Sequence, residues 1–146
     1  MNHMSEIGVA WIREDFRVEN NAALSFATQN HDQVIALYIY NKREYDNKRE
    51  AQKWWLSKSL EGFRKDLSNY KINLQIVEDD ELVFFSKIRK TDKLSVYWNK
   101  IYEPDVIDKG KKIRSVFVKN QINFKYFKGN ILNEYQEVTK NDGNPF

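Results

Sequence analysis

The stretch Ile7–Leu24, IGVAWIREDFRVENNAAL, decides the fold that we expect for this chain. It opens with an apolar run at residues 7–12, which is typical of a strand buried on both faces. A polar loop at residues 13–21 follows, and the Ala/Leu pattern beyond it favours a helix capped by Asn20 or Asn21. Strand, charged loop and helix form the first unit of a doubly wound α/β sheet, in which ligands bind outside the carboxyl ends of the strands.

The alternation of apolar strand and amphipathic helix continues along the chain. We expect further strands over residues 34–40, 72–77, 94–98 and 122–127, and helices over residues 49–70, 81–90 and 104–119. Such alternation predicts parallel strands joined by right-handed crossovers. The sequence therefore predicts a three-layer α/β/α, Rossmann-like domain over residues 1–130, whose doubly wound sheet has five parallel strands in the order 3-2-1-4-5. Residues 131–146 are expected to form an irregular tail.

Composition narrows the classes of protein. The chain has 146 residues, of which 41% are hydrophobic and 14% aromatic, as in a packed domain. Lys and Arg number 24 against 21 Asp and Glu, and a net charge of +3 does not by itself indicate a nucleic-acid partner. The chain has no cysteine, which argues against a disulfide scaffold. It has only two histidines, which argues against a histidine-based metal site. No apolar run reaches the ~20 residues of a membrane span and no signal-peptide pattern is present, so we expect a cytoplasmic protein without membrane contact.

The usual motifs of catalysis and phosphate binding are missing from the sequence. No G-x-G-x-x-G or G-x-x-x-x-G-K-[ST] follows a predicted strand, and no serine lies in a G-x-S-x-G turn. The acidic run Glu78-Asp79-Asp80 is best interpreted as the start of a helix, where carboxylates are favourable. We therefore expect no catalytic residue and no metal ligand in this domain.

Two polar clusters follow the first and fourth strands, which the predicted strand order makes neighbours. Their helices lie on opposite faces of the sheet, so the two loops diverge and leave a crevice. Aromatic, cationic and amide groups around such a crevice suit a planar polar heterocycle. The predicted binding residues are Arg13, Asp15, Arg17, Tyr38, Asn99, Tyr102 and Glu103. The alternative is that the charged members pair with one another and only tie the loops together.

The first loop also resembles the opening motif of the DNA photolyase/cryptochrome family, W-F-R-x-D-L-R-x-x-D-N-P-A-L. The matching residues are Trp11, Arg13, Asp15, Arg17, Asn21, Ala23 and Leu24. The segment Trp54–Leu60 is similar to the family's W-W-L-x-x-S-L helix, and Trp98–Pro104 is similar to its N-x-x-Y-E-P segment. Two late segments, Gly129–Leu132 and Gly143–Phe146, resemble the run that leads into the family's interdomain linker.

The sequence departs from the family pattern at two places. Lys109-Gly110 stands where the family usually has Arg-Asp, and Lys48–Ala51 replaces a small-residue segment before the double tryptophan. These changes bear on which antenna ligand the domain holds.

The resemblance implies the N-terminal α/β domain of a deoxyribodipyrimidine photolyase. In that family this domain holds an antenna chromophore, which is a folate, a deazaflavin or FMN. The antenna passes excitation to FAD in a helical C-terminal domain, and the full-length enzyme, a carbon–carbon lyase, repairs pyrimidine dimers in damaged DNA. The resemblance thus implies that the FAD-binding domain is absent from this chain and is its natural partner, and that the domain alone is not catalytic.

Three other functions remain open on the sequence. A cryptochrome-type photoreceptor would use the same domain for signalling. A stand-alone nucleotide-binding α/β module would need a Gly-rich loop late in the chain, for which Lys128-Gly129-Asn130 is a poor substitute. A phosphoacceptor domain would need acidic residues after the first and third strands.

Overall fold

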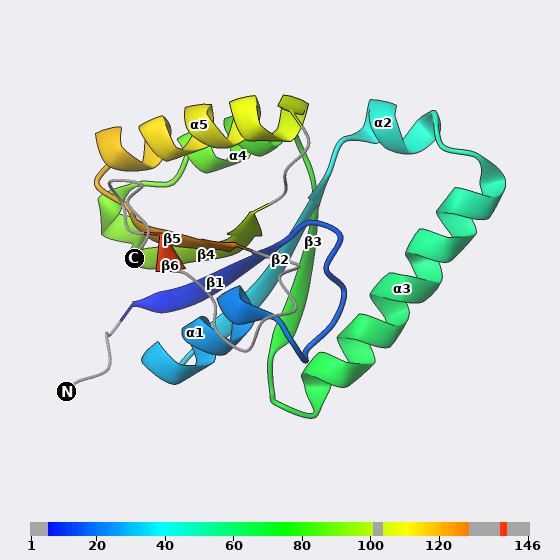
Figure 1. Cartoon of the computed structure of the whole chain (residues 1–146), viewed down its shortest axis with the longest axis horizontal. Coiled ribbons are helices and arrows are strands. Elements are labelled where there is room, and N and C mark those ends of the chain that lie inside the picture. Colours follow the sequence, from blue (N-terminus) through cyan, green and yellow to red (C-terminus); the bar gives the residue numbers. More distant parts are fainter. Residues whose placement is uncertain (1–5, 101–103, 129–137, 140–146) are drawn as a thin grey trace.

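The computed structural model describes residues 6–100, 104–128 and 138–139 (Figure 1). In chain order the elements are β1 (Ile7–Ile12), α1 (Ala22–Asn30), β2 (Val34–Tyr40), α2 (Lys42–Asp46), α3 (Glu50–Ser68), β3 (Asn73–Glu78), α4 (Glu81–Ser86), the 3-10 turn η1 (Lys90–Asp92), β4 (Leu94–Lys100), α5 (Pro104–Lys119), β5 (Asn123–Lys128) and β6 (Val138–Thr139).

The sheet confirms the predicted topology. Its strand order is β3-β2-β1-β4-β5-β6, and the first five of these strands are parallel. The short strand β6 is an addition within the segment expected to be irregular, and it pairs antiparallel with Tyr126 and Phe127 of β5. The strand order reverses between β1 and β4. In doubly wound sheets the ligand-binding crevice lies at that point.

Alternate residues of each strand pack on opposite faces of the sheet, into separate hydrophobic cores. Trp11, Val96 and Trp98 face α4 and α5, where Ile113 and Phe117 cover them. The intervening residues face α1 and α3. These helices lie on the other side of the sheet from α4 and α5 (Figure 1). Because both faces of β1 are covered, its sequence is apolar throughout, as the pattern of a central parallel strand predicts. Strand β4 is covered likewise but also contains the buried polar residues Ser95 and Asn99.

Helix boundaries follow local capping. Asn21 is the N-cap of α1, and its Oδ1 accepts from the backbone N–H of Leu24 at 3.1 Å. The preceding Asn20 has φ 55°, a left-handed conformation that asparagine tolerates well. The second of the two predicted caps is therefore the real one.

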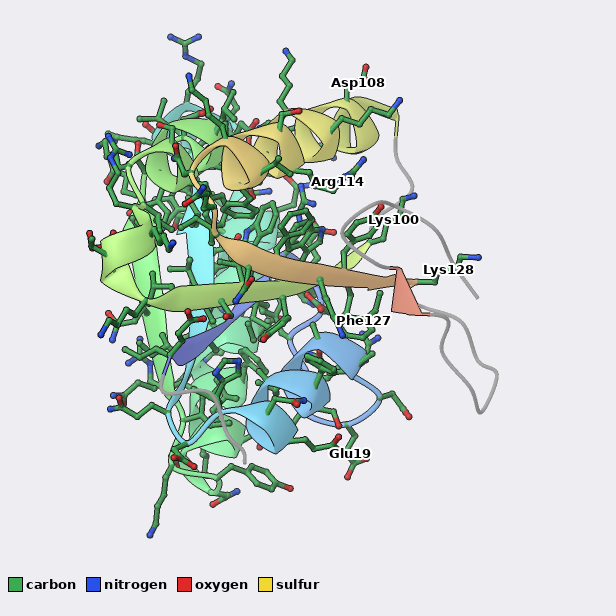
Figure 2. All side chains as sticks on the ribbon, turned by 90° about the vertical axis from the view of Figure 1, so that its left-hand side faces the viewer. Glu19, Lys100, Asp108, Arg114, Phe127 and Lys128 are labelled. Atoms are coloured by element: carbon green, nitrogen blue, oxygen red, sulfur yellow. The ribbon has the colours of Figure 1, made fainter. Side chains whose placement is uncertain are left out.

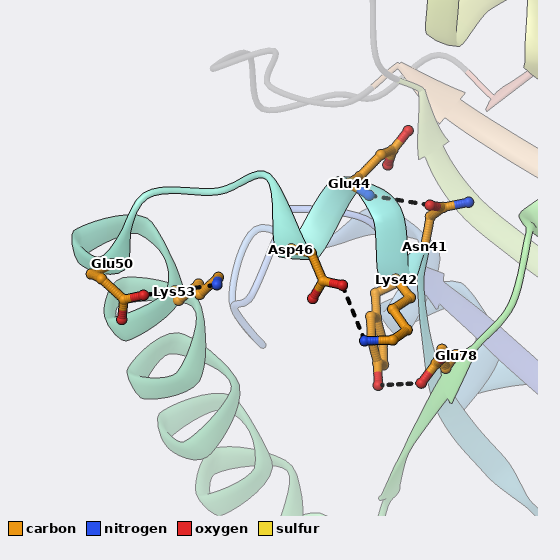
Figure 3. A network of polar contacts seen from close by, with 8 residues as sticks. Asn41, Lys42, Glu44, Asp46, Glu50, Lys53 and Glu78 are labelled. Carbon is orange, nitrogen blue, oxygen red and sulfur yellow. Dashed lines mark hydrogen bonds and ion pairs between the residues drawn. The ribbon is translucent and has the colours of Figure 1, made fainter.

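Residues 42–46 form α2, a helix that the sequence did not predict between the strand at 34–40 and the helix at 49–70. Asn41 Oδ1 accepts from the N–H of Glu44 at 3.2 Å, and Lys42 Nζ lies 3.0 Å from Asp46 Oδ2 one turn later (Figure 3). A cap and an i,i+4 ion pair thus close a single helical turn that carries no apolar periodicity.

Two further boundaries differ from the expected ones. The helix that begins at Glu81 ends at Ser86 instead of near Lys90, and η1 follows it. Strand β4 continues through Asn99 and Lys100, which pair with Phe127 and Lys128. Asn99 consequently projects from a rigid strand and not from a loop.

None of the helices in these described ranges has both the length and the apolar character needed to cross a membrane.

Candidate functional site

Asn99 connects three segments at the carboxyl end of the sheet. Its side chain is 8% exposed and lies on the α1 face. Asn99 Nδ2 donates to Asp15 Oδ2 at 2.7 Å and to Asn21 Oδ1 at 2.8 Å. Asn99 Oδ1 accepts from the N–H of Ala23 at 3.0 Å, in the first turn of α1. One amide thereby fixes β4, the loop after β1 and the start of α1 to one another.

The loop after β1 is held by further internal hydrogen bonds. Asp15 Oδ1 accepts from the backbone N–H of Arg13 at 3.0 Å. Asn21 Nδ2 donates to the carbonyl of Arg17 at 2.9 Å, and Arg17 Nε donates to the carbonyl of Asn20 at 3.3 Å. These contacts build the loop itself, which is the alternative that the sequence left open for its charged residues.

Arg13 lies on the other face of the sheet. Its guanidinium is 4.3 Å from the centroid of the Trp11 ring, and its Nη2 is 3.7 Å from Glu81 Oε1 at the start of α4. Lys109 Nζ is 3.6 Å from the same oxygen. Burial raises the pKa of Glu81, while the charges of Arg13 and Lys109 oppose that rise. Arg13 therefore belongs to an ion network between β1, α4 and α5.

The predicted residues do not all converge. Asp15 and Asn99 are in direct contact, and Arg17 supports the same loop. Arg13 faces α4 and α5, whereas Tyr38 faces α3. Tyr102 and Glu103 lie outside the described residues, so the single cluster stays a prediction in their case.

A pocket of about 300 Å³ opens beside Tyr38, between the loop after β1 and the first turns of α3. The lining residues are Glu14, Phe16, Tyr38, Lys48, Ala51, Gln52, Trp55 and Leu56. The rings of Phe16 and Tyr38 lie edge to face with centroids 5.4 Å apart, and Phe16 meets Trp55 at 6.1 Å. The pocket thus has aromatic walls, with a cation, an amide and a carboxylate among its lining groups.

The hydroxyl of Tyr38 is a neutral donor at pH 7. Burial raises the pKa of Tyr38 to about 12, and the carboxylates of Glu14, Glu81 and Glu44 add to the shift. A protonated phenol in an apolar pocket can donate one hydrogen bond to a ligand oxygen or nitrogen.

Sequence reasoning found only Tyr38 among these lining residues. Ala51 and Gln52 precede Trp55 by four and three residues, which places the three on one side of the start of α3, and Lys48 lies just before that helix. That spacing is the signal by which they could have been found. This signal was hidden because Trp55 is adjacent to Leu56, a buried core residue of α3, so Trp55 also looked like a core-packing residue.

The chemistry of the pocket is that of binding. Within the described ranges no group of three or more His, Cys, Asp or Glu side chains could hold a metal ion. Aromatic edges, a neutral phenol, an amide and one ammonium suit a planar heterocycle with polar substituents. The fold and the pocket together define a doubly wound α/β domain with a ligand-sized hollow at the carboxyl ends of its strands.

Comparison with known sequences gives the family. The sequence model of the DNA photolyase family matches residues 8–146, and the chain belongs to that family. The deoxyribodipyrimidine photo-lyase of Agrobacterium fabrum is 27% identical over 139 residues, which is 94% of this chain and 29% of that protein. Cryptochrome-2 of Arabidopsis thaliana is 25% identical over 98% of this chain and 24% of its own length.

Solved structures agree with the fold. A bacterial class III photolyase from Agrobacterium tumefaciens has a TM-score of 0.77 at 24% identity and covers 92% of this chain. An archaeal photolyase from Sulfolobus tokodaii, solved with two FAD molecules, has a TM-score of 0.75 at 26% identity and covers 84% of this chain. This chain spans 28% and 29% of those two chains, respectively, and so corresponds to a part of each.

Proposed function

We propose that this chain is the antenna domain of a deoxyribodipyrimidine photolyase and that the pocket beside Tyr38 holds the antenna chromophore. The observation that carries the proposal is an aromatic-walled pocket of about 300 Å³, at the carboxyl ends of the strands, in a member of the DNA photolyase family. A bound chromophore would supply absorption of blue light and transfer of excitation to FAD in a second, helical domain. Repair of pyrimidine dimers in damaged DNA would belong to the full-length protein.

The pocket residues fit a flavin-type ring, either FMN or a deazaflavin. Phe16 and Trp55 offer apolar surface for a flat ring system, and the neutral Tyr38 hydroxyl and the Gln52 amide can fix its polar edge. Lys48 can bind a phosphate as a point charge. All lining residues come from this one domain, which favours these ligands over a folate that needs a second domain to complete its site.

The domain itself needs only to bind and hold the ring. Three hydrogen bonds from Asn99 fix the loop that carries Glu14 and Phe16 to the sheet. The opposite wall is the start of α3, a regular helix. A site built on fixed elements keeps its ligand in one orientation, which excitation transfer to a second chromophore requires.

The matching model is that of the DNA photolyase family, and the Agrobacterium fabrum relative is a deoxyribodipyrimidine photo-lyase. These two matches favour a photolyase function over a cryptochrome function. Membership of this family also favours the photolyase function over a stand-alone nucleotide module and over a phosphoacceptor domain.

Two adjacent tryptophans provide a matched test. Both side chains are largely exposed, Trp54 at 64% and Trp55 at 54%, but only Trp55 lines the pocket. We expect FMN added to the purified chain to bind with quenching of its fluorescence, and Trp55→Ala to weaken binding about tenfold, the loss of roughly 1.4 kcal/mol of ring contact. Trp54→Ala should leave the affinity within about twofold. Equal effects of the two variants, or no binding of FMN or a deazaflavin, would refute the assignment of this pocket.

A further inference from the structure

A second hollow lies between α5 and β5, on the face of the sheet opposite the Tyr38 pocket. Its volume is about 450 Å³, and its lining residues are Lys111, Arg114, Ser115, Val118, Lys119 and Phe124. We call it the α5 groove. Its outer wall is cationic, and its remaining surface is apolar because Phe124 and Val118 contribute to it. Figure 2 shows Arg114 reaching from α5 toward the edge of the sheet, on the same side as Lys100 and Lys128.

Arg114 is held in place by an aromatic ring. Its guanidinium carbon lies 4.7 Å from the centroid of Tyr126, and Lys100 Nζ lies 5.7 Å from the same centroid. A cation–π contact orients a guanidinium without neutralising its charge. The N–H groups of Arg114 therefore stay available to an anion while the side chain is already ordered.

Positive charge is concentrated around this groove. Burial lowers the pKa of Lys100, and the neighbouring charges of Arg114, Lys128 and Lys111 lower it further. Among the ion pairs between described side chains, none involves Lys111, Arg114 or Lys119. The net charge of +3 for the whole chain conceals this local excess, although α5 also carries Asp105 and Asp108 before the groove residues.

The cations extend along the helix and do not converge on one point. From Lys111 to Lys119 the axis of α5 rises about 12 Å, at about 1.5 Å per residue. Each strand of duplex DNA advances about 3.4 Å along the helix axis per phosphate, so this length corresponds to about three to four phosphates. A small anion would use only one end of such an arrangement.

We propose that the α5 groove binds a nucleic-acid strand through its phosphates, without reading its sequence. Lys111, Arg114 and Lys119 contact successive phosphates, and the exposed Val118 lies against a sugar or base. Binding of this kind holds any strand, damaged or intact, and requires no catalytic step. It is therefore separate from the chromophore pocket and from recognition of a lesion.

The test measures binding of a fluorescently labelled single strand of about 16 nucleotides by anisotropy, between about 50 and 200 mM salt. The triple variant Lys111→Gln, Arg114→Gln, Lys119→Gln should bind about tenfold more weakly at the lower salt. Removal of three cations from the phosphates should also reduce the slope of log K against log salt by about 2, at about 0.7 per phosphate.

A second triple variant removes the same charge from another helix. Lys58→Gln, Arg64→Gln, Lys65→Gln takes one arginine and two lysines from the exposed side of α3. We expect this variant to stay within about twofold of the unmodified chain. If the α5 triple variant loses its fold, the double variant Lys111→Gln, Lys119→Gln leaves Arg114 on Tyr126. It should still weaken binding about fivefold, because two of the three phosphates no longer meet a cation.

Three outcomes would overturn the proposal. Equal losses in the α5 and α3 variants would mean that net charge alone governs binding. Competition by polyglutamate of matched charge as effective as competition by DNA would indicate an acidic protein partner in place of a nucleic acid. No binding at the lower salt would show that the α5 groove is only a solvated face.

Discussion

Replacement of Asn99 by alanine should unfold the domain at a distinctly lower temperature. The change removes one hydrogen bond to the carboxylate of Asp15, worth about 1.5–3 kcal/mol, and two neutral ones worth about 1 kcal/mol each. The N–H of Ala23 is left without its partner in a buried position. A destabilisation of roughly 4 kcal/mol is therefore expected.

The corresponding shift in melting temperature follows from the size of the chain. At about 2.1 cal/mol/K per residue, 146 residues give an unfolding entropy of about 0.3 kcal/mol/K. Division of roughly 4 kcal/mol by this entropy gives a fall in Tm of about 13 °C. The assay is thermal unfolding followed by circular dichroism at pH 7, with a denaturant titration as a second measure of stability.

Asn41→Ala is the matched control. Asn41 also caps a helix, but its bond to the N–H of Glu44 is single and exposed, so a loss of about 1 kcal/mol or less is expected. If Asn99→Ala lowered Tm no more than Asn41→Ala does, the three-way connection would contribute little. Asn99 would then be free to serve a ligand, as the sequence suggested.

Asn99→Asp adds a pH signature. It places a second carboxyl group within hydrogen-bond distance of Asp15, so the pKa of the pair is raised above its unfolded value. The proton that the folded variant retains makes it more stable relative to the unmodified chain as the pH falls from 7 toward about 4. A constant difference between the two proteins over that range would contradict the arrangement.

Three further predictions concern single sites. In Gly8→Ala the new Cβ would lie 2.7 Å from His31 Cδ2, so we expect a loss of about 1–3 kcal/mol that His31→Ala partly restores, measured in a double-mutant cycle by urea unfolding. Because the folded pKa of Tyr38 is raised to about 12 from 10, its share of stability is present below pH 10 and is lost as the pH rises toward 12; Tyr38→Phe should flatten the alkaline fall in Tm. Trp54→Gln should change the free energy of unfolding by less than about 0.5 kcal/mol, since the side chain is 64% exposed, and a larger loss would show hidden packing.

The order and type of the main elements were accessible from the sequence because the signals are local. Apolar runs such as Val34–Tyr40 are long, and the helix after β1 carries its own N-cap signal. Right-handed crossovers then leave few ways to order five parallel strands. The short helix α2 and the two-residue strand β6 escaped prediction because neither has an apolar period; α2 depends on a cap and one ion pair, and β6 on pairing with a distant strand.

The residues predicted to bind a ligand lie together only in part, for a geometric reason. Sequence alone determined which polar residues gather at the carboxyl ends of β1 and β4, since strand order places those ends side by side. Only the tertiary structure decided how the side chains divide: Arg13, just beyond β1, reaches Glu81 at the start of α4, whereas Tyr38 packs toward α3. The cationic α5 groove is lined by one helix and the strand that follows it, whereas the pocket beside Tyr38 arises from three segments that are far apart in the chain. No local pattern records such a meeting, since it depends on which helix packs over which strand.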